Sequence, residues 1–183
     1  QIEFLNGEAI SVNSQTFKNQ SKLISFLETL VEGYGIGRGI HVGDTIIGIK
    51  GRVGFSAAAA LILIETHRLL EKHTLTKNQL KIKERFALYY GELLHEGLAL
   101  DPVMRDIEAF LSESQKRVTG LVKLVISPKS IEMQGIESPY DLYDTKFGSY
   151  GESAEGWSAD DAKGFIKLYG KNLSLYFAKQ DAE

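Results

Sequence analysis

The spacing of hydrophobic residues predicts a hairpin, a helix and a strand in the first third of the chain. Apolar and polar positions alternate over residues 1–5 and 8–12, and the Asn-Gly pair between them is typical of a two-residue turn. A helical period follows from Leu23 and is expected to end near Gly33. Residues 45–53 are predicted to form one strand, because β-branched residues favour extended backbone.

Three long helices are predicted for the middle of the chain. Ser56 is expected to cap the first, which ends near His73, and the second covers about 77–95. The third spans 102–115 and starts with an aspartate N-cap followed by proline, the residue favoured in the first helical position. Each carries apolar residues on one side, so all three are predicted to face a core.

The last third returns to a period of two. Residues 117–127 and 130–137 read as a second hairpin, and 138–157, rich in Tyr, Gly, Asp and Ser without a clear period, as a long loop. A closing helix is predicted from Ser158 toward Phe177, weakened by two glycines. Because strands precede, interrupt and follow the helices, the predicted class is α+β, with a mainly antiparallel sheet packed against a block of long helices.

Composition narrows the classes of partner. The chain has 183 residues, 43% of them hydrophobic, and a net charge of −3, which disfavours a general nucleic-acid or anionic-membrane surface. It contains no cysteine, which excludes disulfides and thiolate metal sites. No stretch reads as a membrane span or signal peptide, so a cytoplasmic protein is predicted.

Candidate chemistry gathers in the segment IHVGDTIIGIKGRVGF, residues 40–55. Lys50 and Arg52 are expected on one side of a strand, glycines allow close approach to the backbone, and the helix starting at Ser56 would offer free N–H groups. Arg38, just before this segment, is a further cation. The arrangement suits a carboxylate or phosphate; the alternative, a solvated basic strand edge leading into a core helix, stays open.

Other motifs are less informative. The glycine-rich stretch GYGIGRG, 33–39, follows a helix and precedes a strand, the reverse of the order in a dinucleotide-binding fingerprint. The four histidines lack the spacing of a metal site, and neither a nucleophile elbow nor a phosphate loop occurs. No metal site is therefore predicted, and no catalytic residue.

Five segments resemble, in order and spacing, the C-terminal synthetase domain of the argininosuccinate synthase family. The likeness covers the chain from the first hairpin to the last helix and is strongest to the subgroup seen in Bacteroidetes-type bacteria. The segments are GYGIGRGIHVGDTIIGIKGRVGF, LILIETHRLLEKHTL, DPVMRDIEAFLSESQKRVTG, GIESPYDLYD and DAKGFIKLYG.

The resemblance implies part of an ATP-dependent ligase. Such enzymes adenylate the ureido oxygen of citrulline, forming citrullyl-AMP and pyrophosphate, and the aspartate amine then displaces AMP to give argininosuccinate. ATP and Mg²⁺ are bound mainly by an N-terminal domain that this chain lacks, so residues 1–183 are expected to bind no cofactor and to be inactive alone. Because the chain opens inside a strand, it is expected to be the C-terminal part of something longer.

The resemblance also implies assembly. Residues 158–183 would form an oligomerisation arm that contacts a neighbouring subunit in a homotetramer. A rival hypothesis is a stand-alone binding or assembly module derived from this domain. A gene that encodes a glycine-rich ATP loop upstream would favour the ligase.

Two positions depart from the family pattern. Where the family has a glutamate and a tyrosine that contact the amino-acid end of citrulline, this chain has Gly43 and Phe55, whereas Lys50 and Arg52 are kept. Losing the carboxylate and the hydroxyl predicts a substrate with an uncharged nitrogen, such as N-acetyl- or N-succinylcitrulline. A succinyl carboxylate would meet Lys50, Arg52, Arg38 or the helix end at Ser56. The alternative, a turn glycine with the free amine held by another residue, stays open.

Overall fold

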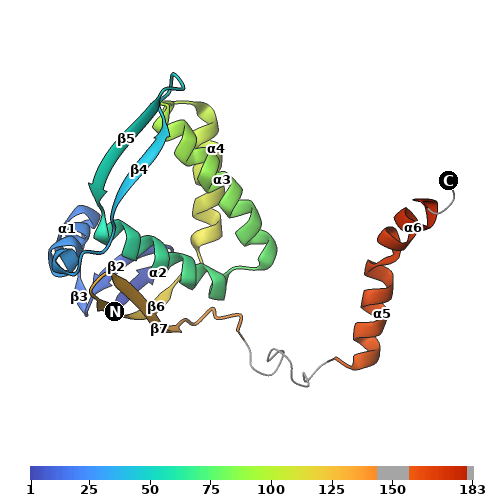
Figure 1. The fold of residues 1–183 in the computed structure, drawn as a ribbon. Helices are drawn as coiled ribbons and strands as arrows, with labels where there is room; N and C mark the ends of the chain where they lie inside the picture. Colours follow the sequence, from blue (N-terminus) through green and yellow to red (C-terminus); the bar gives the residue numbers. More distant parts are fainter. Residues whose placement is uncertain (144–156, 181–183) are drawn as a thin grey trace. The chain divides into compact units, whose positions relative to one another are not determined.

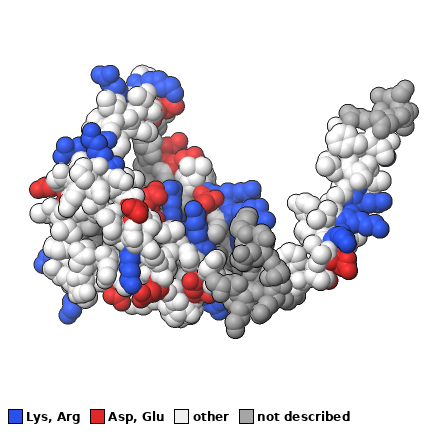
Figure 2. Space-filling model, turned by 60° about the horizontal axis from the view of Figure 1, so that its bottom comes forward, with Lys and Arg blue, Asp and Glu red and all other residues white. Residues whose placement is uncertain are grey.

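The computed structural model describes residues 1–143 and 157–180 (Figure 1). The chain divides into two compact units, Gln1–Leu142 and Tyr143–Glu183. The first unit consists of helices and antiparallel sheets, which confirms the α+β class that the sequence predicts. None of the helices in the described ranges has the length and hydropathy needed to cross a membrane. On the face shown in Figure 2, acidic and basic side chains are interspersed over the first unit.

A five-stranded antiparallel sheet forms the base of the first unit. Its strands lie in the order β3-β2-β1-β6-β7, and both predicted hairpins are confirmed. Ile2 lies opposite Val122, so the two hairpins are joined through β1 and β6. The two-residue β3 was not predicted. The strands are β1 (Ile2–Leu5), β2 (Glu8–Val12), β3 (Gln15–Thr16), β6 (Gly120–Ser127) and β7 (Ser130–Glu137).

Helices α1 (Gln20–Val31) and α2 (Ala58–Thr74) pack on each other and on this sheet (Figure 1). The Asn19 side chain caps α1 by accepting a hydrogen bond from Lys22 N, and the short 3₁₀ helix η1 (Glu32–Tyr34) follows α1. The main core lies between the helices and the sheet. Its most buried side chains are Ile2, Val12, Leu23, Val31, Ile62, Leu70, Val118 and Val122.

Helices α3 (Lys77–His95) and α4 (Pro102–Gln115) pack against each other through a second, small cluster formed by Leu93, Met104 and Ile107. Their bounds are those predicted. The expectation that α3 faces a core holds for only part of the helix: Leu93 is its one buried residue, and Leu80 is partly buried against the main core. The cluster between two helices is too narrow to cover the whole apolar side of α3.

A buried polar network fastens α2 to α3 and α4. The Glu71 carboxylate is 2% exposed and accepts hydrogen bonds from Lys83 Nζ at 3.0 Å and from Gln115 Nε2 at 2.9 Å. His67 Nε2 lies 2.9 Å from Gln115 Oε1, and burial lowers the pKa of His67. These contacts satisfy the buried carboxylate that would otherwise destabilise the core.

The second unit contains α5 (Ala159–Tyr169) and α6 (Lys171–Gln180). Ser158 caps α5 in a capping box with Asp161, as the sequence predicts for the helix start. The prediction of one continuous helix is wrong, because the helix is interrupted at Gly170, a residue with low helix propensity. Most of the loop predicted over 138–157 lies outside the described residues.

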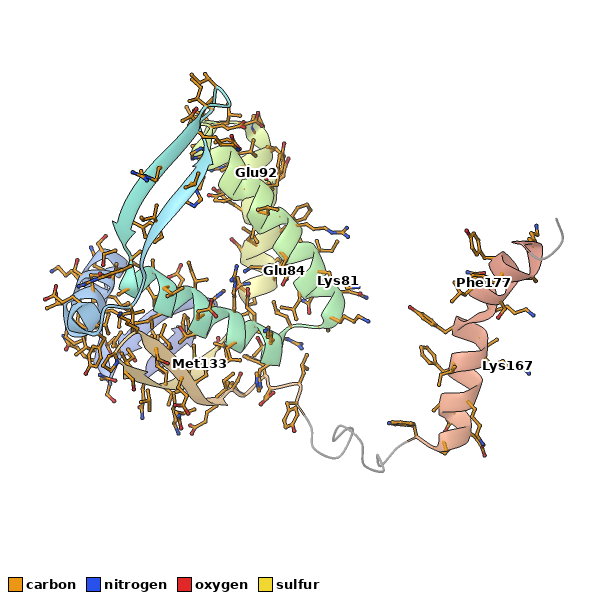
Figure 3. All side chains as sticks on the ribbon, in the orientation of Figure 1. Lys81, Glu84, Glu92, Met133, Lys167 and Phe177 are labelled. Atoms are coloured by element: carbon orange, nitrogen blue, oxygen red, sulfur yellow. The ribbon has the colours of Figure 1, made fainter. Side chains whose placement is uncertain are left out.

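The two helices of the second unit expose a large apolar surface. Figure 3 shows Lys167 on α5 and Phe177 on α6. The apolar side chains that are more than half exposed are Phe165, Ile166, Leu168, Tyr169, Leu173, Leu175, Tyr176 and Phe177.

Candidate functional site

The candidate site is built on a separate two-stranded hairpin, β4 (Arg38–Asp44) and β5 (Lys50–Ser56). The chain reverses at 45–49, so the single strand predicted over 45–53 is wrong. Gly48 has a φ of 77° and its N–H donates to Thr45 O at 2.8 Å, which closes the turn. The tip of the hairpin lies at the end of α3 (Figure 1), where His95 Nε2 is 3.3 Å from Asp44 O.

Cross-strand pairing places the predicted site residues on two opposite faces of this hairpin. The register is regular, with Gly43 opposite Gly51 and Gly39 opposite Phe55, and side chains alternate between faces along each strand. Gly43 and Phe55 therefore share a face, and the four predicted polar residues lie on the other. The glycine face carries Gly39, His41, Gly43, Gly51, Val53 and Phe55; the basic face carries Arg38, Ile40, Val42, Asp44, Lys50, Arg52, Gly54 and Ser56.

On the basic face, Lys50 and Arg52 differ in their partners. Lys50 Nζ forms an ion pair with Asp44 Oδ1 at 2.6 Å, and both side chains are exposed. Arg52 lies opposite Val42, and within the described residues its guanidinium has no hydrogen bond or ion pair. Because Asp44 already neutralises much of the Lys50 charge, Arg52 is the stronger candidate for an external anion.

The start of α2 is already capped by another carboxylate. Ser56 is the last residue of β5 and does not cap the helix, contrary to the prediction; the N-cap is Ala57. Glu28 Oε2, on α1, accepts a hydrogen bond from Ala59 N at 2.7 Å. A carboxylate in this position satisfies an otherwise free N–H and interacts favourably with the helix dipole. The helix end therefore does not serve as a ready anion site.

The glycine-rich loop before the hairpin packs on this helix start. Gly37 has a φ of 66°, and a Cβ added there would lie 2.7 Å from the carbonyl of Ala57. Gly37 O also accepts a hydrogen bond from Ala57 N at 3.0 Å. Arg38, the next residue, donates from Nη2 to Glu32 O at 3.2 Å. The loop thus joins η1, β4 and α2, and its glycines serve close packing.

Two rings lie over glycines on the glycine face. A Cβ added to Gly39 would be 3.5 Å from Phe55 Cζ, and one added to Gly43 would be 2.6 Å from His41 Nε2. The imidazole therefore occupies the space that a side chain at position 43 would need. Sequence reasoning considered the histidines only as metal ligands and missed His41. The signal it could have used is the spacing of two between His41 and Gly43 in a strand.

Two hollows border the hairpin, and neither is lined by Gly43 or Phe55. One has a volume of about 660 Å³, and the cations Arg38 and Lys129 are among its lining residues. The other has a volume of about 410 Å³ and lies beside His95 at the tip of the hairpin. The first is lined by Gly35, Ile36, Gly37, Arg38, Leu61, Lys129 and Ile131. The second is lined by Thr45, Ile46, Ile47, Ile49 and His95.

Across residues 1–143 and 157–180, no three His, Asp or Glu side chains converge as metal ligands would. The helix N-terminus nearest the basic face is already occupied by Glu28.

Comparison with known proteins agrees with the resemblance noted in the sequence. The family model described as "Arginosuccinate synthase C-terminal domain" matches residues 1–176. Argininosuccinate synthase from Xanthomonas axonopodis pv. citri (strain 306) is 40% identical over 175 residues, 96% of this chain and 42% of the relative. The proteins of that name from Xylella fastidiosa (strain Temecula1) and Dictyoglomus turgidum are 38% and 36% identical, over 96% and 98% of this chain.

These relatives are longer than the present chain, which spans 42–45% of their length. The matched region begins at residue 1 and includes the hairpin with both of its faces. The chain therefore belongs to the argininosuccinate synthase family and corresponds to its C-terminal domain.

Proposed function

We propose that this chain forms one wall of the citrulline site in an ATP-dependent carbon–nitrogen ligase, an argininosuccinate synthase. The observation that carries the proposal is the match of nearly the whole chain to relatives of that name, of which it spans less than half. The reaction joins citrulline and aspartate to give argininosuccinate, with ATP converted to AMP and pyrophosphate. The nucleotide would bind mainly to another part of the longer enzyme, as the resemblance to the family implies.

The glycine face is the part of this domain that would meet the amino-acid end of citrulline. Gly43 and Phe55, which occupy the positions corresponding to the family's citrulline contacts, lie together on it. Arg52 on the other face would act through its charge on a bound carboxylate. Arg38 is engaged with Glu32 O and Ser56 ends a strand, so neither is retained as a direct ligand in this proposal.

We further propose that the substrate is an N-acylated citrulline. Among the six residues of the glycine face none is acidic, so a free α-ammonium would find no charge partner there. Acylation removes that positive charge. A succinyl carboxylate placed beside Gly43 would not meet Lys50 or Arg52, because these lie on the opposite face. The imidazole of His41 is the polar group within reach.

The test is an assay of the longer enzyme that carries this domain, with citrulline, N-acetylcitrulline and N-succinylcitrulline in turn. Release of pyrophosphate that depends on aspartate supports the ligase, and a higher kcat/KM with an acylated form supports the finer proposal. A preference for free citrulline of about tenfold, or about 1.4 kcal/mol in transition-state binding, would exclude acylated substrates. If none of the three substrates led to release of pyrophosphate, a binding module without catalysis would be favoured.

One variant and the 183-residue chain alone sharpen this test. Gly43→Glu introduces a carboxylate on the glycine face and is expected to shift the preference toward free citrulline. It also forces His41 to move, because the new Cβ would lie 2.6 Å from Nε2. The 183-residue chain alone is expected to release no pyrophosphate. Activity of this short chain would show that the adenylation groups lie within it.

We propose that α5 and α6 bind another subunit, as the arm of a homo-oligomer that is a tetramer in the longer enzyme. The exposed apolar side chains of this unit are more than a terminal helix pair needs in isolation. Deleting residues 171–183 is expected to lower both the oligomeric state, measured by sedimentation, and the thermal stability. A monodisperse monomer at high micromolar concentration, with no stability lost on deletion, would contradict this.

A further inference from the structure

His41 is the one side chain of the glycine face that carries a polar atom. The other five strand residues of this face are three glycines, a valine and a phenylalanine. His41 lies opposite Val53, and its ring leans along β4, so that Nε2 is 2.6 Å from where a Cβ of Gly43 would be. A ligand group that reached the position of a Cβ on Gly43 would therefore be in contact with this nitrogen.

The surroundings leave His41 available to a ligand. The side chain is exposed, and within the described residues it has no hydrogen bond or ion pair. No side chain at position 43 lies between Nε2 and an approaching group, and position 51, directly opposite, is also glycine. Positions 43 and 51 therefore present only backbone beside the imidazole.

The tautomer of a neutral imidazole that carries its proton on Nε2 separates acylated from free amino groups, whereas the tautomer protonated on Nδ1 would accept a hydrogen bond from an ammonium at Nε2. A neutral histidine with its proton on Nε2 donates a hydrogen bond there, and an amide oxygen only accepts. An ammonium group only donates, so it has nothing to accept from this nitrogen and is repelled when the ring is charged. A donor at Nε2 therefore favours the carbonyl of an N-acyl group, or the terminal carboxylate of an N-succinyl group.

We propose that His41 is a specificity-determining residue, whose Nε2–H donates a hydrogen bond to an oxygen of the substrate's N-acyl group beside Gly43. This inference rests on the proposed function, and it assigns to His41 the recognition that the proposed substrate requires. Phe55, on the same face, would contact the apolar part of the acyl group.

The experiment compares three variants of the longer enzyme with the wild type. His41→Phe keeps a planar ring but removes the donor, and His41→Gln keeps an N–H donor of similar reach. His95→Phe is the matched control, because it makes the same change at an exposed histidine that contacts the same hairpin at its tip. Each is assayed with citrulline, N-acetylcitrulline and N-succinylcitrulline, and thermal unfolding confirms that each is folded.

His41→Phe is expected to lower the ratio of kcat/KM for N-acetylcitrulline to that for citrulline by about three- to tenfold, the range of one neutral hydrogen bond. The loss should fall mainly on KM, because the contact is made equally in the ground and transition states. His41→Gln should recover most of it, and His95→Phe should leave the ratio unchanged. A larger loss with N-succinylcitrulline would identify the terminal carboxylate as the acceptor; equal losses would identify the shared amide oxygen.

The outcomes distinguish this inference from the proposal on which it rests. A wild type that prefers free citrulline overturns the acylated substrate and this role of His41 together. A wild type that prefers an acylated form, with a ratio that His41→Phe leaves unchanged, overturns the role of His41 alone. A loss in His41→Gln as large as in His41→Phe would also overturn it, because the donor would then not be what matters.

Discussion

Replacing Gly37 with alanine tests how the hairpin is joined to α2. Gly37 has a φ of 66°, a left-handed conformation, and an added Cβ would lie 2.7 Å from both the carbonyl carbon and the oxygen of Ala57. Those atoms are backbone at the start of a helix, so they cannot turn aside as a flexible side chain could. The substitution is therefore expected to displace the base of the hairpin from the helix.

The magnitude follows from two terms. A left-handed conformation costs an alanine about 1–2 kcal/mol, and overlap with fixed atoms typically adds about 1–3 kcal/mol. Gly37→Ala should then lower the free energy of unfolding by about 2–5 kcal/mol. Gly48 offers a matched control, because its φ is 77° and no atom lies within 4 Å of an added Cβ. Gly48→Ala should cost only the conformational term, about 1–2 kcal/mol.

Urea unfolding followed by far-ultraviolet circular dichroism measures these differences, with linear extrapolation to zero denaturant. Gly33→Ala serves as a second control, because an added Cβ there meets no atom within 4 Å and the backbone is not left-handed. It should change the unfolding free energy little. Equal losses for Gly37→Ala and Gly48→Ala would refute the packing argument, since strain alone would then account for both.

Three further predictions concern charged side chains. Lys83→Ala should destabilise the fold by about 3 kcal/mol, because it removes the cation beside the buried Glu71 carboxylate. Lys81→Ala, at an exposed position of the same helix (Figure 3), should change the free energy of unfolding by no more than about 0.5 kcal/mol. Equal losses in denaturant unfolding would contradict the role of the ion pair between Lys83 and Glu71. Burial lowers the pKa of His67 below its ordinary 6.5, so at a pH just below 6.5 the unfolded chain binds more protons than the folded one. Stability should therefore fall as the pH drops through 6.5 toward the folded-state pKa. Thermal midpoints measured across this range should fall less steeply for His67→Gln than for the wild type. Arg52→Gln should change stability by about 0.5 kcal/mol or less. It should weaken binding of a substrate carboxylate that reaches the basic face in the longer enzyme by about 1.5–3 kcal/mol. Unchanged kinetics would show that Arg52 is only a solvated charge.

Local signals in the sequence were sufficient for most element boundaries. The aspartate N-cap and the proline in the first position of α4 predicted its start, and the Asn-Gly pair predicted the first hairpin, because such turns and caps depend on residues within a few positions of one another. The same reasoning wrongly predicted one strand over residues 45–53, because it gave more weight to the β-branched residues than to Gly48. Gly48 adopts a left-handed conformation and forms the turn. The turn there was readable from the glycine but was taken for a bend in a strand.

The candidate site depended on contacts between distant residues. The sequence by itself predicted most of the elements, the family and the segment of the candidate site. It could not show that Glu28, 31 positions earlier, caps the helix in place of Ser56, because hydrogen-bond partners across elements are set by packing. Nor could it divide the candidates between two faces, since that division needs the register of β4 with β5. Only the tertiary structure separated Gly43 from Arg52 and placed the His41 ring over Gly43. The reason is that the residues sharing a face of a hairpin are defined only when the partner strand and its register are known.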